Sequence, residues 1–449
     1  MEEEESGGGV SGHFALAHMV LVKARELRFS SEYDLNAIHL AGAMYYSAAR
    51  HDAQQQDAAR AVRELIDATP DAAECQRAVH LLDIHHKTID ENAELLAKIA
   101  HYVRFAQAAY SLTAAEAMLS CGLGSSLLDS DFVCFEPVAQ NGMPAYFVVL
   151  EVGGVVRRCV IAIRGTKEWN DVCADLTFDT AELLDGRAHR GVLQAARALQ
   201  LTLEERLLDL LDADVVDELV VTGHSLGGAI AMTLALLLRT SSERTDTFVV
   251  ANTSCVAVSP APCVSENLLE RCKSFTASLV LGFDVVPRLS ATSLERMLAR
   301  LAESEWEGDA KLSIEAALQS YVPARVRSTV ATATLSLTER YLAARFRAER
   351  KQQGSPPSPP PQLPGPAAHG CSPATSSPRA RCQSSVEHVE MHVGGRIFHL
   401  RHFCQPDLVF LSEIDAKTLL DIVPSFYKLR DHRTESIIDA LQLALARTY

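Results

Sequence analysis

The sequence predicts an α/β fold with a mainly parallel central sheet, a helical N-terminal segment and a helical, proline-rich insertion. The first observation is an alternation between residues 132 and 290. β-rich runs such as "AYFVVLEV", "ELVVTG" and "SFTASLVLG" alternate there with helical runs such as "VLQAARALQLTLEERLLDLL". The second is composition. The chain has 449 residues, of which 48% are hydrophobic, and this is enough to build a sizeable core.

Composition divides the chain into four segments. Residues 1–94 form a helical N-terminal region, residues 95–290 the first part of the α/β core, residues 291–385 an insertion and residues 386–449 the last part of the core. Within the insertion, "GSPPSPPPQLPGPAAHGCSPATSSPR" is too rich in Pro, Ser and Gly to bury a core, so we expect a flexible or polyproline-like stretch. The motif "PPSPPP" there is a candidate ligand for a protein partner, and a plain flexible loop is the alternative.

The core segments carry recognisable boundaries. Gly153 and Gly154 separate "AYFVVLEV" from "RRCVIAIRGT" and predict a β-hairpin. A second hairpin is predicted for "VEHVEMHVGGRIFHLRHF", and a final helix around "TESIIDALQLALA". Helices are expected on both faces of the sheet.

Charge and composition exclude several function classes. The net charge of −15 argues against affinity for nucleic acid or anionic membranes through bulk charge. The acidic start "MEEEESGGG" lacks a signal-peptide pattern, and the apolar stretch Phe14–Val22 is too short to span a bilayer. The 11 cysteines include no CxxC pair, so we expect reduced thiols and no zinc site. Together these features predict a cytoplasmic protein; peripheral action at a membrane is implied only by the family resemblance given below.

Ser225 carries the strongest chemical signal. It lies between the strand "ELVVTG" and the helix "GGAIAMTLALLL", in the frame Gly223-His224-Ser225-Leu226-Gly227. A nucleophile elbow needs this pattern, because its turn is so tight that the residues two before and two after the serine must be small. We therefore interpret Ser225 as a nucleophile on a strained turn. A plain glycine-rich turn is the alternative.

A serine hydroxyl needs a base, and the base needs a carboxylate that orients it. In enzymes with this elbow, the chain order is Ser, then Asp or Glu, then His. Asp284 in "LVLGFDVVPRLS" follows an apolar strand, which would deliver it to the same sheet edge as Ser225. Asp421 in "DIVPS" is a rival, but it follows a helical run. Asp431 is another, but it adjoins the best histidine in sequence and their side chains would diverge.

The base must come from the histidines that follow Ser225. The candidates are His369, His388, His392, His399, His402 and His432. His369 lies in the proline-rich stretch, and His399 and His402 fall in or just after a strand. We favour His432 in "KLRDHRTES", because a loop at a helix start can bring an imidazole to the edge of the sheet. An ordinary surface histidine is the alternative.

Two backbone N–H groups are candidates for an oxyanion hole. The first is that of Leu226, at the N-terminus of the helix after the elbow. The second is that of Thr166, which follows the strand "CVIAI" and Arg164-Gly165. The alternative is that Arg164-Gly165 forms only a turn.

These motifs together resemble a known family. "IAIRGT", "AHRGVLQAAR", "LVVTGHSLGGAIA", "DVVPRLS", "GRIFHL" and "DHRTESIIDAL" occur in the order found in class 3 lipases, and among these the chain is most similar to the sn-1-specific diacylglycerol lipases. The resemblance covers about residues 95–290 and 386–449. It implies an α/β-hydrolase fold that cleaves an acyl ester of diacylglycerol to monoacylglycerol and a free fatty acid, without a metal or organic cofactor.

The resemblance also assigns roles. It implies that Ser225 is the nucleophile, Asp284 the orienting acid and His432 the base, with Thr166 and Leu226 forming the oxyanion hole. It further implies that residues 291–385 are a lid or regulatory insert.

The partner expected from this reading is a lipid substrate at a membrane or droplet surface, with no nucleic acid. The animal diacylglycerol lipases carry four N-terminal membrane spans and the sequence predicts none here, so membrane anchoring is not carried over. Two other readings stay open: a phospholipase A1 or triacylglycerol or galactolipid lipase of the same fold, and a non-catalytic lipid-binding scaffold. The sequence leaves the oligomeric state open.

Overall fold

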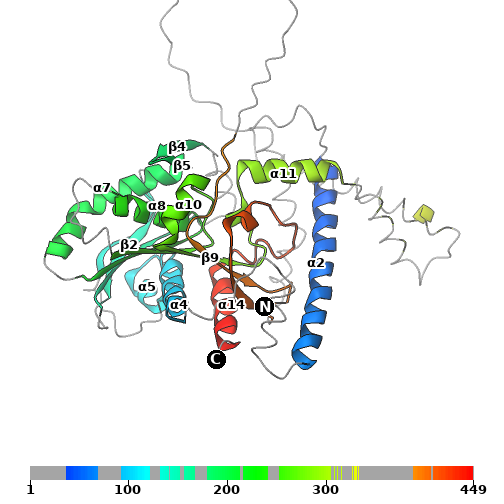
Figure 1. Cartoon of the computed structure of the whole chain (residues 1–449), viewed down its shortest axis with the longest axis horizontal. Coiled ribbons are helices and arrows are strands. Elements are labelled where there is room, and N and C mark those ends of the chain that lie inside the picture. Colours follow the sequence, from blue (N-terminus) through cyan, green and yellow to red (C-terminus); the bar gives the residue numbers. More distant parts are fainter. Residues whose placement is uncertain are drawn as a thin grey trace, which may run out of the picture. The chain divides into compact units, whose positions relative to one another are not determined.

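The computed structural model describes most of the chain in segments. These are residues 37–68, 93–121, 132–140, 142–151, 156–166, 179–212, 216–240, 252–304, 388–405 and 408–447, with isolated residues between 308 and 332. Contacts group Met1–Trp306 with Val389–Tyr449 as one unit and Glu307–His388 as a second. All elements labelled in Figure 1 belong to the first unit. The proline-rich stretch and its His369 lie outside the described residues.

An eight-stranded sheet forms the centre of the first unit, in the order β1-β2-β3-β6-β7-β8-β9-β10. Its strands are β1 (Phe132–Glu136), β2 (Tyr146–Glu151), β3 (Arg158–Ile163), β6 (Glu218–His224), β7 (Thr253–Val258), β8 (Thr276–Leu281), β9 (Arg396–Arg401) and β10 (Phe410–Ile414). The pairs from β3 to β9 are parallel, and the pairs at both edges are antiparallel. The α/β fold with a mainly parallel sheet is therefore confirmed. A separate two-stranded ribbon joins β4 (Thr180–Leu183) to β5 (Gly186–His189).

One predicted hairpin is confirmed and the other is wrong. β2 and β3 pair antiparallel, as Gly153-Gly154 predicted. The second glycine pair, Gly394-Gly395, does not turn the chain back on itself. Gly395 has φ +88°, and a Cβ there would clash with Thr276 at the start of β8. The chain uses this freedom to enter the sheet beside β8, so β9 pairs parallel with β8 and antiparallel with β10.

Helices cover both faces of the sheet (Figure 1). One face carries α7 (Arg190–Asp212), α8 (Leu226–Thr240) and α10 (Glu266–Lys273), and the other carries α4 (Ala93–Ala108) and α14 (Thr434–Arg447), with α5 (Ala114–Ser120) against α4. Every residue of α8 from Gly227 to Leu238 is buried, because its sequence is apolar on all sides and such a helix must lie inside a core.

The core beneath the sheet holds the strands in register. Buried side chains of α4 and α14, such as Phe105 and Leu441, pack on strand residues such as Val220 and Phe398. Close packing of this kind leaves the strand ends little freedom. The loops after β6 and β8, which carry Ser225 and Asp284, therefore start from fixed points.

The N-terminal region contributes the long helix α2 (Ala37–Ala68), which contacts α11 (Ala291–Ala302). Ala59 and Val62 of α2 pack on Phe403 and Leu408, in the loop between β9 and β10. Within the described segments, no helix combines the length and hydropathy needed to cross a bilayer.

Candidate active site

Ser225 lies on a strained turn between β6 and α8. Its φ is +60°, a left-handed conformation that costs free energy for any residue with a side chain. A Cβ on Gly223 would clash with the Gly227 backbone, and a Cβ on Gly227 would clash with the carbonyl of Ile163 on β3. Both glycines are therefore required for the turn, and a plain glycine-rich turn would not need this packing against β3.

Ser225, His432 and Asp284 form one chain of hydrogen bonds. Ser225 Oγ lies 2.9 Å from His432 Nε2, and His432 Nδ1 lies 3.0 Å from Asp284 Oδ2. Since a carboxylate accepts, Nδ1 carries the proton and Nε2 is free to accept from the serine hydroxyl. Ser225 and Asp284 have no exposed surface, and the His432 side chain is 12% exposed. The three residues come from three loops that are distant in sequence.

The loop after β8 fixes the orientation of the Asp284 carboxylate by a hydrogen bond from its own backbone. Asp284 Oδ1 accepts from the backbone N–H of Val286 at 2.9 Å, which leaves Oδ2 for His432. The fully buried Arg288 completes this loop and donates to the carbonyls of Thr418 and, at 3.4 Å, Gly282. Burial lowers the pKa of Arg288 to about 10, and the negative charge of Asp284 opposes that shift. Arg288 therefore stays charged at neutral pH and offsets buried negative charge.

His224 fixes the backbone of His432. Its Nε2 lies 2.8 Å from the His432 carbonyl, and its Nδ1 lies 2.9 Å from the hydroxyl of Tyr110. The carbonyl can only accept, so Nε2 carries the proton and Nδ1 accepts from Tyr110. Burial, with the nearby His432 as a second cause, holds the pKa of His224 well below its usual range. His224 is therefore neutral, and it links Tyr110, which follows α4, to the backbone of His432.

Thr166 and Leu226 lie beside Ser225. Thr166 follows Gly165, where a Cβ would meet the Ser225 Cβ at 3.1 Å, so this loop runs directly against the elbow. Leu226 is the first residue of α8, and the first N–H groups of a helix have no acceptor within it. Both residues are therefore neighbours of Ser225, and their role as oxyanion donors stays a prediction.

The rival acids and histidines have other partners. Asp421 pairs with Arg296 at 2.8 Å on the surface. Asp431 lies 2.7 Å from His402 Nε2, so its carboxylate points away from His432, as its sequence position indicated. His399 donates to the carbonyl of Gly282 at 2.9 Å.

Sequence reasoning missed the groups that support these residues. Tyr110 gave no signal, because it follows α4 and meets His224 only through the fold. Arg288 and the pair formed by His402 and Asp431 were visible as charged residues near motifs, but their burial was not. The one available signal was position, since Asp431 directly precedes His432.

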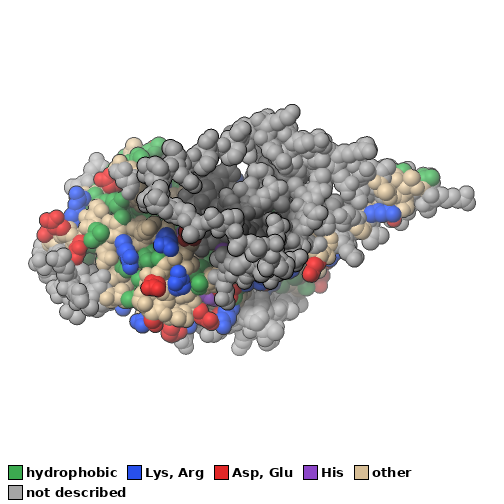
Figure 2. All heavy atoms as spheres, turned by 90° about the horizontal axis from the view of Figure 1, so that it is seen from above, with side chains coloured by type: hydrophobic (Ala, Val, Ile, Leu, Met, Phe, Trp, Pro, Cys, Tyr) green, Lys and Arg blue, Asp and Glu red, His purple; other side chains and the backbone are tan. Residues whose placement is uncertain are grey.

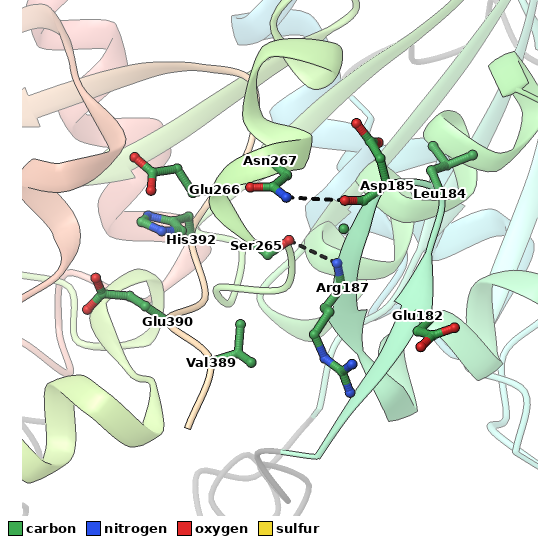
Figure 3. A pocket seen from close by; sticks show the side chains of 11 residues that line it. Glu182, Leu184, Asp185, Arg187, Ser265, Glu266, Asn267, Val389, Glu390 and His392 are labelled. Atoms are coloured by element: carbon green, nitrogen blue, oxygen red, sulfur yellow. Dashed lines mark hydrogen bonds between the residues drawn. The ribbon is translucent and has the colours of Figure 1, made fainter. Parts of the chain in front are cut away.

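A polar cavity of about 570 Å³ lies elsewhere in the first unit (Figure 3). Glu182, Asp185, Arg187, Glu266, Glu390 and His392 are among its lining residues, and Ser225, Asp284 and His432 are not. So many charges do not suit an acyl chain. Among the described residues, no three His, Cys, Asp or Glu side chains gather as a metal site would require.

Comparison with known proteins finds a family that matches part of the chain. Residues 160–294 match the family described as "Lipase (class 3)". The match covers less than half of the chain, so it identifies residues 160–294 as a class 3 lipase segment. The matched segment contains Thr166, the elbow and Asp284, whereas His432 lies beyond it.

Several curated proteins are similar over about a third of this chain. Diacylglycerol lipase-beta of Mus musculus is 35% identical over 150 residues, which are 32% of this chain and 21% of that protein. Diacylglycerol lipase-alpha of Homo sapiens is 32% identical over 161 residues, 33% of this chain and 15% of that protein. "Secreted mono- and diacylglycerol lipase 1" of Fusarium solani is 27% identical over 165 residues, 35% of this chain and 49% of that protein. The chain thus matches less than half the length of each.

Solved structures of fungal lipases are similar as well. Rhizomucor miehei triacylglyceride lipase aligns with a TM-score of 0.38 at 19% identity, covering 44% of this chain and 76% of that one. Lipase II from Rhizopus niveus aligns with a TM-score of 0.36 at 16% identity, covering 47% and 79%.

Proposed function

We propose that the protein is a serine lipase that hydrolyses an acyl ester of diacylglycerol to monoacylglycerol and a free fatty acid. One observation carries the proposal: an unbroken hydrogen-bond chain from Ser225 through His432 to Asp284, with the serine on a strained elbow. A satisfied core serine would need neither the strain nor a buried carboxylate behind its partner. The class 3 lipase family match supports the same reading.

The first half of the reaction forms an acyl-enzyme. Ser225 Oγ attacks the ester carbonyl while His432 Nε2 takes the hydroxyl proton, and Asp284 stabilises the resulting imidazolium. The N–H groups of Thr166 and Leu226 donate to the oxyanion, which is worth about 3 kcal/mol for each donor. His432 then protonates the leaving glycerol oxygen, and the acyl–glycerol bond breaks.

The second half restores the enzyme. Water attacks the acyl carbon and gives its proton to His432, and the same N–H groups hold the second oxyanion. The serine oxygen leaves with the proton from His432, and the fatty acid is released. Each proton returns to its starting atom, so the chain's own groups complete the cycle.

The substrate class comes from relatives. Proteins named diacylglycerol lipase are 32–35% identical to this chain over 150 to 161 residues, and the Fusarium solani relative is named for mono- and diacylglycerol. Diacylglycerol resides in lipid surfaces, so we place the reaction at a membrane or droplet surface, with the protein bound peripherally.

The test is product analysis with the purified full chain. Vesicles containing diacylglycerol, phosphatidylcholine, a galactolipid or triacylglycerol are incubated with wild type or Ser225→Ala, and fatty acid and glycerolipid products are quantified. We expect monoacylglycerol from wild type and a loss of about 10⁶-fold in Ser225→Ala. Hydrolysis of phospholipid, galactolipid or triacylglycerol without hydrolysis of diacylglycerol would refute the substrate assignment.

Asp284 and its sequence rival Asp421 supply a matched pair of variants. Asp284→Asn should lose about 10⁴-fold in kcat, because an amide favours the wrong tautomer of His432. Asp421→Asn changes an exposed acid in a similar "DxVP" context and should stay near wild type. Equal losses in both variants, or Ser225-independent labelling by a fluorophosphonate probe, would remove the proposed triad.

A further inference from the structure

A second buried histidine and aspartate lie directly behind the first pair. Asp431 Oδ2 lies 2.7 Å from His402 Nε2, and the same oxygen accepts the backbone N–H of Phe283 at 2.8 Å. Asp431 and His402 are 1% and 3% exposed. The acyl-transfer mechanism uses neither side chain. A buried carboxylate is costly unless it is hydrogen-bonded, and Asp431 depends on these two donors.

The hydrogen bonds define the protonation of His402. Its Nδ1 accepts the backbone N–H of Cys404 at 3.0 Å, so the ring proton lies on Nε2 and is donated to Asp431. His402 is thus a neutral donor to a carboxylate. Burial raises the pKa of Asp431, while the hydrogen bond from His402 opposes that shift.

The connectivity of this carboxylate is the decisive feature. Phe283, whose N–H it accepts, directly precedes Asp284, and Asp431 itself directly precedes His432. One oxygen therefore joins the residues before the two members of the Asp284–His432 pair. A shift of either loop must stretch this link before it can change the 3.0 Å distance between Asp284 and His432.

The backbone at Gly282 makes room for the Asp431 carboxylate and the His402 ring. Gly282 has φ +45°, and a Cβ there would clash with both His402 and Asp431. Its carbonyl accepts from His399 at 2.9 Å and its N–H donates to Leu400 at 2.7 Å. The loop before Asp284 is thus held from several sides, and only a glycine permits the close approach.

We propose that Asp431, supported by His402, is a positioning residue that sets the separation of Asp284 and His432 by joining their two loops. The inference rests on the proposed function, because it assigns a purpose to that separation. Asp431 acts through the backbone of Phe283 and does not touch the reacting atoms.

The test compares two substitutions at one position. Asp431→Asn keeps one oxygen that can accept both N–H groups, whereas Asp431→Leu has similar size and no acceptor. We measure kcat and KM for a soluble ester, and the downfield proton NMR signal of the His432 Nδ1–H that Asp284 accepts, which Asp284→Asn should remove. Asp431→Leu should lower kcat by about 100-fold with KM nearly unchanged and displace or abolish the signal, because a misplacement of about 1 Å costs that much. Asp431→Asn should restore both readouts to near wild type.

A stability control separates positioning from folding. Leu268→Ala removes a fully buried side chain on α10 and should lower the thermal midpoint without changing kcat or the NMR signal. If Asp431→Leu does not fold, His402→Leu tests the same link by removing the donor to Asp431, with an expected kcat loss of about tenfold and a displaced signal.

The outcomes are distinct. An unchanged NMR signal and kcat in the folded Asp431→Leu or His402→Leu variant would overturn the positioning role, as would equal losses in Asp431→Asn and Asp431→Leu. If wild type shows no Ser225-dependent turnover but the signal responds as expected, the proposed function fails and the positioning role stands.

Discussion

His224 shows how one residue of the elbow motif serves the fold and the site together. Its side chain points at the His432 carbonyl on one side and at the Tyr110 hydroxyl on the other. The imidazole rings of His224 and His432 lie 4.6 Å apart, so a proton on His224 would oppose the imidazolium that forms on His432. A neutral His224 is therefore a condition for the proposed chemistry.

This neutrality predicts a pH dependence of stability. The pKa of His224 is lowered in the folded protein by burial, so the unfolded state binds more protons as pH falls below about 6.5. Its contribution to stability is full above that pH and is lost below it, by up to about 1.4 kcal/mol per pH unit. We expect the thermal midpoint of wild type to decrease when the pH is lowered from 7.5 to 5.5, and that of His224→Gln to decrease less. Parallel pH profiles in the two proteins would contradict this.

At the residue scale, the sequence predicted what local patterns encode. Ser225, Gly223 and Gly227 follow from a five-residue pattern that is specific for a tight strand-to-helix turn. Asp284 and His432 follow from their positions after a strand and before a helix. The roles of Tyr110 and Asp431 depend on side chains that meet only after the sheet has formed, and no local pattern encodes such contacts.

Among the elements, α2 is the least expected contributor. Its Asp52, 5% exposed, accepts the backbone N–H of Phe426 at 2.9 Å, six residues before His432. The ring of His51 packs edge-on against Phe283, with centroids 4.8 Å apart. One helix turn thus contacts both loops that carry the proposed acid and base. This helix lies outside the residues that match the lipase family.

We expect α2 to support activity through this carboxylate. Asp52→Leu leaves the Phe426 N–H without its acceptor and should cost about 1–3 kcal/mol of stability, with a lower kcat. Asp57→Asn, on the exposed side of the same helix, is the matched control and should stay within about 0.5 kcal/mol of wild type. Denaturant unfolding and ester hydrolysis measure the two effects. Equal stability and kcat in the two variants would show that α2 docks without influencing the site.

The elements of the core were predictable to different degrees. The parallel strands were predictable because a sheet covered on both faces needs strands that are apolar throughout, and such runs stand out between helical segments of the sequence. The hairpin at Gly394-Gly395 was wrong because two glycines predict a sharp turn and a close approach equally well. Which one occurs depends on β8, a strand more than a hundred residues earlier in the chain. The docking of α2 was unpredictable because Asp52 is one of many polar residues on a long helix.

At the scale of the whole molecule, the hydrogen bonds of the proposed triad are formed while the proposed nucleophile, Ser225, is buried. Ser225 has no exposed surface although its hydrogen bonds are in place. On the face shown in Figure 2, basic and acidic side chains of the described residues are interspersed, and the net charge is −15. Attraction to an anionic membrane by bulk charge is therefore weak, and a lipid surface would have to engage the protein through apolar contact.

These facts predict how access to Ser225 depends on a lipid surface. A water-soluble fluorophosphonate should label Ser225 slowly in buffer, because a state that exposes the hydroxyl is a minor one. If that state is populated at about 10% or less in water, a surface that binds it preferentially can raise the labelling rate about tenfold. We expect this increase with vesicles of neutral phosphatidylcholine, little change on raising salt, and a smaller increase with anionic vesicles, since the protein is itself acidic. Ser225→Ala gives the background. Labelling at one rate with and without vesicles would mean that the hydroxyl is reached in water, and that the buried position of Ser225 does not limit the reaction.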